Sequence, residues 1–188
     1  MTTIGAIQGE NWVVLGYDSR VSEDDGRMYT LPKTKGKIVK NGKYYLGAAG
    51  DMRAINLLGQ VFVPPYESDL KGIALDRFIS NKFIPALRGC FEMHGYGKEG
   101  EQESSIAVAI NGVFYEIGSN YDWCHDERGV YGFGSGGGYL LGSLYTYEPD
   151  DYRTVEGAKS IMRNALTISS KLDHRSGAPF NVIVQETE

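Results

Sequence analysis

The chain has 188 residues, which favours one domain over residues 1–188 with a core large enough to fold without disulfide bonds. Its 19 basic and 24 acidic residues give a net charge of -5 with no basic run, which argues against nucleic acid or an anionic membrane surface as the main partner. No apolar run approaches the roughly 18 residues of a membrane-spanning helix, and the first residues lack the basic and apolar regions of a signal peptide.

The first 46 residues predict two β-hairpins. Gly9-Glu10-Asn11 is a turn signal between two segments of β-branched, small or apolar residues. Asn41-Gly42, also between apolar segments, is a strong short-range hairpin signal. Residues 19–34, which separate the hairpins, are polar, and we expect them to be irregular. The predicted strands are 2–8, 12–17, 37–40 and 43–46.

The middle of the chain predicts two helices and a third hairpin. Apolar residues at helical spacing mark the first helix, which Pro64-Pro65 stops. The second helix has an expected break at Pro85. A loop rich in glycine and glutamate at 95–103 then leads to a hairpin that turns at Asn111-Gly112. The predicted helices are 52–62 and 69–93, and the predicted strands are 105–110 and 113–117.

The last third of the chain predicts two more helices and a closing strand. A glycine-rich stretch, 132–138, precedes a helix from about Tyr139, and residues 155–172 have the spacing of an amphipathic helix. The last strand is expected at Phe180–Val184. Because the strands are grouped in hairpins and the helices in pairs, we expect antiparallel sheets covered by helical layers, an α+β sandwich.

Thr2 is a candidate nucleophile. We expect Met1 to be removed because the next residue is small, which leaves Thr2 with a free α-amine beside its hydroxyl. An α-amine has an ordinary pKa of about 7.7–8.0, so it is partly neutral near pH 7 and able to act as general base for that hydroxyl. A chain that keeps Met1 has no such amine, and we expect it to be inactive.

Six short segments follow one another along the chain and carry a resemblance. They are Thr2-Thr3-Ile4, Asp18-Ser19-Arg20, Lys37-Ile38, Ala49-Gly50, Gly134-Ser135-Gly136-Gly137 and Asp173-His174-Arg175-Ser176-Gly177. In this order they resemble segments of the proteasome β-type family, including the bacterial HslV peptidases. No single segment is very specific, but the six together span nearly the whole chain.

The resemblance implies a role for each matching residue. Thr2 would be the nucleophile and its own amine the base. Lys37 would lower the pKa of the Thr2 hydroxyl with its positive charge, and Asp18 would hold Lys37 in place. The backbone N–H of Gly50 would stabilise the oxyanion of the tetrahedral intermediate. Hydrogen bonds that orient the amine and the attacking water would come from Ser135, Asp173 and Ser176.

The resemblance also implies a fold, an activity and an assembly. The fold would be the four-layer αββα sandwich of the Ntn hydrolases, with helices outside two antiparallel sheets. The activity would be that of a threonine-type endopeptidase, which forms an acyl-enzyme ester with a protein or peptide substrate and needs no cofactor and no metal. The chain would form homo-oligomeric stacked rings of six or seven subunits, which an ATP-dependent unfoldase would feed.

Several alternatives stay open. The loop before Lys37 is longer than in typical members of the family, so Lys35 competes with it, because residues two apart share a strand face. The family's lysine directly precedes an isoleucine or valine, which favours Lys37. Asp51-Met52-Arg53 also departs from the family's pattern, so the pocket beside the nucleophile is expected to differ. The same fold would suit an amidase of small amides, or a structural ring subunit that never frees Thr2.

Two rival motifs fit the sequence less well. Residues 132–137 match the dinucleotide-binding fingerprint G-x-G-x-x-G, but that fingerprint belongs in a parallel βαβ unit and this chain predicts hairpins. Cys124-His125 lacks the spacing of a metal site, and we expect a plain loop there. The two cysteines, Cys90 and Cys124, make no disulfide framework, so we expect reduced thiols and a cytoplasmic protein.

Overall fold

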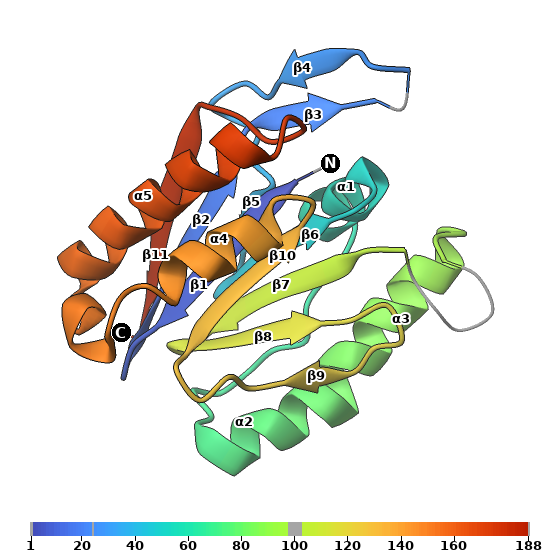
Figure 1. Cartoon of the computed structure of the whole chain (residues 1–188). Coiled ribbons are helices and arrows are strands. Elements are labelled where there is room, and N and C mark those ends of the chain that lie inside the picture. The colour runs from blue at the N-terminus through green and yellow to red at the C-terminus, as the bar shows by residue number, and fades with distance from the viewer. Residues whose placement is uncertain (1, 24, 98–102, 188) are drawn as a thin grey trace.

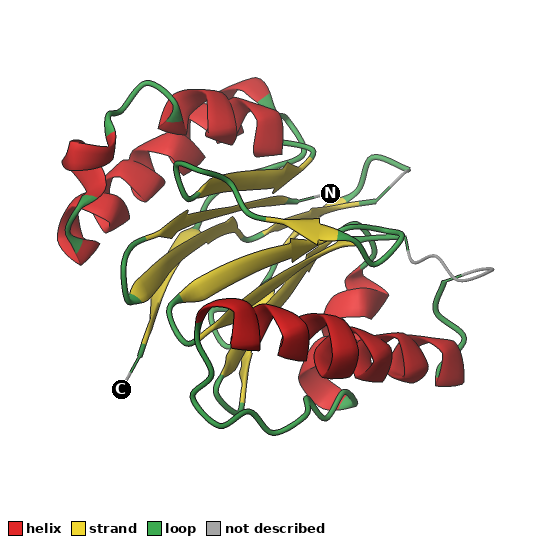
Figure 2. Cartoon of the chain, turned by 90° about the horizontal axis from the view of Figure 1, so that it is seen from below, coloured by secondary structure: helices red, strands yellow, loops and turns green. Residues whose placement is uncertain are grey.

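Four layers make up this computed structural model, which describes residues 2–23, 25–97 and 103–187. Two antiparallel sheets lie face to face, and a layer of helices covers the outer face of each (Figure 2). The αββα sandwich predicted from the sequence is therefore confirmed. Met1 and part of the predicted loop at 95–103 lie outside the described residues, so the removal of Met1 stays a prediction.

The first sheet contains both the first and the last strand of the chain, in the strand order β10-β1-β2-β11 (Figure 1). Its strands are β1 (Thr3–Gln8), β2 (Trp12–Asp18), β10 (Val130–Gly134) and β11 (Phe180–Glu186). β1 and β2 form the predicted hairpin, and Gly5 pairs with Gly16 in its middle. The elements that cover this sheet are α4 (Gly137–Leu144), the short 3-10 helix η2 (Pro149–Tyr152) and α5 (Val155–Leu172).

The second sheet has five strands in the order β5-β6-β7-β8-β9 and contains the other two predicted hairpins. Its strands are β5 (Ile38–Asn41), β6 (Tyr44–Ala49), β7 (Ser105–Ile110), β8 (Val113–Ile117) and β9 (Trp123–Cys124). The helices on its outer side are α1 (Met52–Gln60), α2 (Gly72–Phe78) and α3 (Ile84–Met93). No helix in the described part of the chain combines the length and apolar character needed to cross a membrane.

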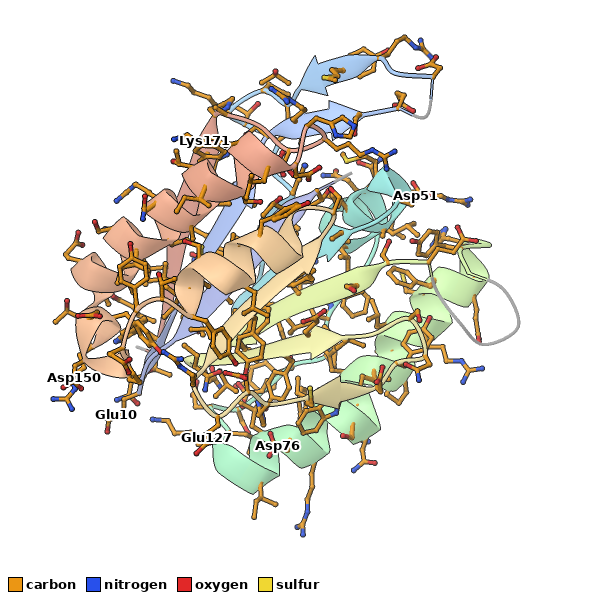
Figure 3. All side chains as sticks on the ribbon, in the orientation of Figure 1. Glu10, Asp51, Asp76, Glu127, Asp150 and Lys171 are labelled. Atoms are coloured by element: carbon orange, nitrogen blue, oxygen red, sulfur yellow. The ribbon has the colours of Figure 1, made fainter. Side chains whose placement is uncertain are left out.

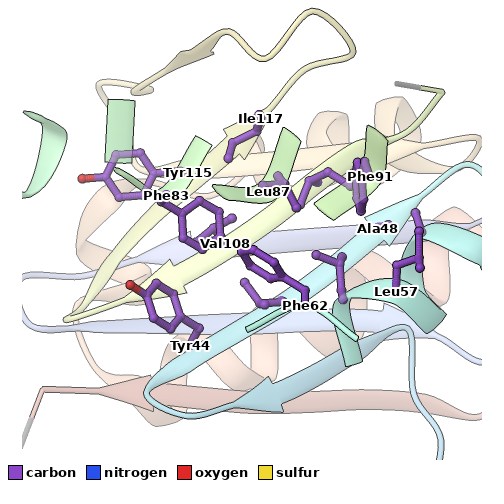
Figure 4. Packing of buried hydrophobic residues seen from close by; sticks show 14 of the residues in the cluster. Tyr44, Ala48, Leu57, Phe62, Phe83, Leu87, Phe91, Val108, Tyr115 and Ile117 are labelled. Carbon is purple, nitrogen blue, oxygen red and sulfur yellow. The ribbon is translucent and has the colours of Figure 1, made fainter. Parts of the chain in front are cut away.

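Three hydrophobic cores hold the four layers together. Between the second sheet and its helices, the ring of Phe83 packs on Tyr44 and Phe62 with centroid distances of 5.2 and 5.5 Å (Figure 4). Between the two sheets, small residues such as Ala107 surround the fully buried Phe114. Between the first sheet and α5, Met162 packs against the backbone of β1 and β2. Burial of such apolar surface is the main favourable term in folding.

The predictions for residues 19–34, for the glycine-rich stretch and for Cys124 need correction. Residues 19–34 are not irregular throughout, because β3 (Arg20–Ser22) pairs with β4 (Met28–Thr30). Residues 132–134 of the glycine-rich stretch belong to β10, which pairs along β1. Cys124 does not lie in a plain loop, because it pairs with Glu116 in the second sheet.

The predicted break at Pro85 is a change of helix type. A π-helical turn, η1 (Ile79–Phe83), joins α2 to α3, and Pro85 lies in the first turn of α3. Proline has no N–H to donate to the carbonyl four residues earlier, and its ring collides with that carbonyl. A wider turn at this point removes the collision while the chain remains helical.

Candidate active site

A fully buried ion pair joins the end of β2 to the start of β5. Nζ of Lys37 donates to Oδ1 of Asp18 at 2.6 Å and to the carbonyl of Arg20 at 2.5 Å. Neither charged side chain of the pair has exposed surface. Burial lowers the pKa of Lys37, while the adjacent Asp18 carboxylate acts in the opposite direction. Lys35, the competing lysine, is exposed and lies in a turn, because β5 begins only at Ile38.

The Asp18 carboxylate accepts three backbone hydrogen bonds in addition to the ion pair. The N–H of Thr3 donates to Oδ1 at 2.9 Å, and those of Arg20 and Gly177 donate to Oδ2 at 3.1 and 3.0 Å. These hydrogen bonds and the ion pair satisfy the buried carboxylate, which makes its burial tolerable. Asp18 therefore fastens β1, the start of β3 and the turn before β11 to one another.

A second polar cluster surrounds Asp173, which directly follows α5. Its Oδ2 accepts from Oγ of Ser135 at 2.7 Å and from Oγ of Ser176 at 2.5 Å, and its Oδ1 accepts from the N–H of Arg175 at 3.1 Å. Burial raises the pKa of Asp173, but these three hydrogen bonds outweigh burial and hold the pKa below its ordinary value. An ionised carboxylate only accepts, so both serine hydroxyls direct their hydrogen at it.

Thr3 and Ser169 belong to this cluster, although sequence reasoning did not single them out. Oγ1 of Thr3 lies 2.6 Å from Oγ of Ser176 and 3.3 Å from Oγ of Ser169, and Ser169 donates to the carbonyl of Gly136 at 2.8 Å. Helical spacing could have indicated Ser169, since it lies four residues before Asp173 and on the same face of the chain. No local pattern points to the side chain of Thr3.

Arg20 is a further residue that the sequence reasoning left without a role. Its guanidinium donates to the carbonyls of His174 and Ser176 at 3.0 and 3.1 Å. A side chain at Gly177 would collide with this guanidinium, because a Cβ there would lie 2.4 Å from Cζ of Arg20. Arg20 therefore holds the turn that carries Ser176 against the start of β3.

The backbone of Thr2 lies beside both polar clusters. Thr2 is 3% exposed, and Oγ of Ser135 lies 3.4 Å from its carbonyl oxygen. At Gly134 a Cβ would lie 2.1 Å from that same oxygen and 3.1 Å from Cβ of Ala49, so only glycine fits between them. This packing also brings Ala49, at the end of β6, close to the backbone of Thr2.

Gly50 has a backbone conformation that depends on glycine. Its φ is +140°, and a Cβ there would lie 2.5 Å from Oγ of Ser104 and 2.7 Å from the carbonyl of Glu103. The next residue, Asp51, caps α1 by accepting from the N–H of Arg53 at 2.8 Å. Gly50 thus lies between the end of a buried strand and the start of a helix.

The candidate site lies at the end of the molecule where the chain begins. Asp51 marks this end in Figure 3, while Glu10, Glu127 and Asp150 lie at the opposite end. A cavity of about 240 Å³ lies away from the site, at the far end of β5. Its lining includes Lys40, Lys43, Asn111 and Gln185, and none of the seven predicted site residues.

The glycine-rich fingerprint and Cys124-His125 lie in settings that differ from a dinucleotide site and a metal site. β10, which carries the start of the glycine-rich fingerprint, pairs antiparallel with β1 and so does not open a parallel βαβ unit. Nε2 of His125 lies 3.2 Å from Oδ1 of Asp76, within hydrogen-bond distance, and the ring of His125 packs on Tyr115. Within residues 2–23, 25–97 and 103–187, no group of three or more histidine, cysteine, aspartate or glutamate side chains could hold a metal ion.

Comparisons with known proteins give likeness in structure only. No protein-family model matches the sequence, and no curated protein matches it. Among solved structures, BPH of Thiobacillus denitrificans in complex with epoxomicin is 17% identical, with 99% of each chain covered and a TM-score of 0.76. A second structure of BPH from the same organism is also 17% identical, covering 99% of this chain and 98% of that chain, with a TM-score of 0.72.

A eukaryotic member of the same structural group gives the same result. The crystal structure of HslV from Trypanosoma brucei is 21% identical, covers 98% of this chain and 99% of that chain, and has a TM-score of 0.65. At these identities the likeness establishes the fold, and the residue roles have to be argued from the site itself. The resemblance inferred from the sequence is confirmed at the level of the fold: this chain has the proteasome β-type and HslV-like Ntn-hydrolase fold.

Proposed function

We propose that the chain is a threonine-type endopeptidase whose nucleophile is Thr2 after removal of Met1. The observation that carries the proposal is the meeting of two polar clusters beside the Thr2 backbone. One is the buried pair of Lys37 and Asp18, and the other is the group formed by Ser135, Asp173 and Ser176. A buried ion pair is a poor source of stability, which favours a chemical role for it over a purely structural one.

The proposed reaction begins with the N-terminal amine as general base. The amine takes the proton of the Thr2 hydroxyl, and Oγ attacks the carbonyl carbon of the scissile peptide bond. The ammonium of Lys37 lowers the cost of the developing negative charge on Oγ and disfavours a second positive charge on the α-amine. The C–N bond then breaks, the leaving amine receives the proton, and water hydrolyses the resulting ester of Thr2.

Gly50 is the proposed source of the oxyanion donor. The packing of Gly134 against both Thr2 and Ala49, the residue before Gly50, supports this role. A backbone N–H at such a position is fixed before the reaction starts, so it stabilises the oxyanion without reorganisation. The hydroxyl groups of Ser135 and Ser176 both donate to Asp173. Toward the N-terminal amine of Thr2, their oxygens therefore act as acceptors.

We further propose that the chain works as a homo-oligomeric ring of six or seven subunits, stacked on a second ring and fed by an ATP-dependent unfoldase in the cytoplasm. The likeness in fold to HslV supports this part of the proposal. On the single chain, several large apolar side chains are 70% exposed or more, and we expect the ring interfaces to cover them. They are Val63, Tyr66, Ile73 and Met93. Native mass spectrometry would give the number of subunits.

Intact mass with and without epoxomicin tests the proposal directly. The expected result is loss of one methionine, followed by a single covalent adduct on the protein. Thr2→Ala should form no adduct, whereas Thr30→Ala, at an exposed threonine of β4, should form it at the wild-type rate. Retained Met1 and no adduct would reject the peptidase and leave a structural ring subunit. An adduct together with cleavage of small amides but not of peptides would instead favour a small-amide hydrolase.

A further inference from the structure

We propose that Thr3 is a positioning residue, whose backbone and hydroxyl hold the two halves of the candidate site together and set how Ser176 faces the Thr2 amine. The inference rests on the proposed function, because it concerns the same N-terminal amine. Thr3 is the first residue of β1, follows Thr2 directly and has no exposed surface. It therefore lies inside the site without being the nucleophile.

Thr3 contacts both polar clusters. Its N–H donates at 2.9 Å to Oδ1 of Asp18, the same oxygen that accepts from Lys37. Its Oγ1 lies 2.6 Å from Oγ of Ser176, which in turn donates to Asp173. Because Thr2 is covalently attached to Thr3, a shift of either cluster against the other would move the proposed nucleophile.

The direction of the hydrogen bonds follows from the acceptors. Ser176 gives its hydrogen to the Asp173 carboxylate, so in the 2.6 Å contact the hydroxyl of Thr3 is the donor. Ser169 gives its hydrogen to the carbonyl of Gly136, which leaves Ser169 as an acceptor toward Thr3 at 3.3 Å. The chain of donation therefore runs from Thr3 through Ser176 to Asp173.

The surroundings of the Thr3 hydroxyl also restrict its rotation away from Ser176. A Cβ at Gly136 would lie 2.0 Å from Oγ1 of Thr3 and 2.4 Å from Oγ of Ser169, so the Thr3 hydroxyl is packed into the space that a side chain at this position would need. β-Branched residues in strands are restricted in χ1, which further fixes the position of Oγ1. The donor of Thr3 is thus held toward Ser176.

This arrangement controls how strongly Ser176 accepts from the amine. Oγ of Ser176 has two lone pairs, and Thr3 occupies one of them. Hydrogen bonds that the ammonium form donates favour the charged state of the amine. By occupying one lone pair, Thr3 weakens Ser176 as an acceptor and helps the Thr2 amine to stay neutral and able to act as a base.

The test compares Thr3→Val, which keeps the shape and loses the donor, with Thr3→Ser, which keeps the donor. Ser170→Ala is the matched control, because it removes a hydroxyl of α5 that donates to the carbonyl of Thr167. Each full-length chain is released from an N-terminal ubiquitin fusion, so that Thr2 is its first residue. Two quantities are measured: the pKa of the Thr2 amine by NMR titration of threonine-labelled protein, and the rate of epoxomicin modification against pH.

Thr3→Val is expected to raise the pKa of the amine by roughly half a unit and to move the acid limb of the rate profile upward by the same amount. Modification at pH 7 should then be about 3-fold slower, while Thr3→Ser and Ser170→Ala follow the wild type. A wild-type pKa and profile in Thr3→Val would overturn the inference, even with a lower melting temperature, since packing alone would explain that. So would Thr3→Ser behaving like Thr3→Val.

The same measurements distinguish failure of the peptidase proposal from failure of the proposal about Thr3. If the wild-type chain is not modified by epoxomicin at any pH, the peptidase proposal fails. The NMR titration still decides the role of Thr3 in that case, because it needs the amine and not the activity.

Discussion

At the residue scale, Lys37 and Lys35 allow a direct comparison. Lys37 is buried against Asp18, whereas Lys35 is exposed. We expect Lys37→Met to slow epoxomicin modification by about 100-fold or more, because a preorganised charge near the proposed nucleophile is lost. Its free energy of unfolding should fall by about 3 kcal/mol, at the low end for a broken buried pair. Asp18 keeps its three backbone donors in this variant, which limits the loss.

Lys35→Met serves as the control for that change. It should alter the free energy of unfolding by less than about 0.5 kcal/mol and leave the modification rate as in the wild type. Urea unfolding and the inactivation rate check both variants. If Lys35→Met were the slower of the two, the assignment of the lysine would be wrong.

Asp173 makes stability depend on pH in a defined direction. Its folded pKa lies below the ordinary value of 3.8, so its contribution is fully present above that value and is lost as pH falls through the folded pKa. Asp173→Asn should therefore cost about 1–3 kcal/mol at pH 7 and progressively less below about pH 4. Unfolding midpoints from pH 7 to 2 check this. Glu10→Gln, at an exposed turn, is the control, and an unchanged cost at pH 2 would contradict the prediction.

The charged residues of the candidate site could be predicted from the sequence better than the residues that contact them. Lys37 stood beside a β-branched residue and Asp18 ended an apolar strand, so both were visible as local patterns. The choice between Lys37 and Lys35 depended on where β5 begins, and strand ends are poorly defined by local sequence. The contacts of Thr3 and Arg20 link residues more than 150 positions apart, and no local pattern encodes them.

At the scale of elements, the spacing between α5 and the first sheet positions the site. α5 leads into Asp173, and β2 ends at Asp18. Gly16, in the middle of β2, has no room for a side chain, because a Cβ there would lie 2.4 Å from Cγ of Met162 on α5. Gly16→Ala should therefore push α5 outward and cost about 1–3 kcal/mol.

The effect of Gly16→Ala should also reach the site. We expect slower epoxomicin modification, because Asp173 moves relative to Asp18. Gly138→Ala is the matched control: a Cβ on Gly138 in α4 meets nothing within 4 Å, so this change should be neutral or stabilise by up to about 1 kcal/mol. Thermal unfolding and modification rates check both. Equal stability of the two variants would show that the contact with Met162 does not limit packing.

The elements that the sequence predicted correctly are the ones with long periodic patterns or a strong turn signal. The Asn41-Gly42 and Asn111-Gly112 hairpins and the 18-residue α5 belong to this group. β3, β4 and β9 have two or three residues each, too few for a period to appear. β10 was missed because glycine at 132 and 134 interrupts its apolar pattern, and the pairing with β1 decides its conformation.

At the scale of the whole molecule, the chain closes on itself. β11, from the C-terminal end, pairs with β2 along its full length, and β2 pairs with β1 from the N-terminal end. The fold could be inferred from grouped hairpins and paired helices, but this closure depends on pairings between distant segments. We therefore propose that residues 1–188 unfold as one cooperative domain, since the core between the sheets is built from residues of both.

The two tryptophans allow that proposal to be tested sheet by sheet. Trp12 begins β2 in the first sheet, and Trp123 lies in β9 of the second sheet with its ring 5.1 Å from that of Tyr115. In Trp123→Phe the fluorescence reports the first sheet, and in Trp12→Phe it reports the second. For each variant, the urea midpoint from fluorescence should equal the midpoint from circular dichroism, because the core between the sheets couples them. Midpoints that differ between the two probes of one variant would mean that the sheets unfold separately. If fluorescence and circular dichroism give the same midpoint and this midpoint rises with protein concentration, folding is also linked to subunit assembly.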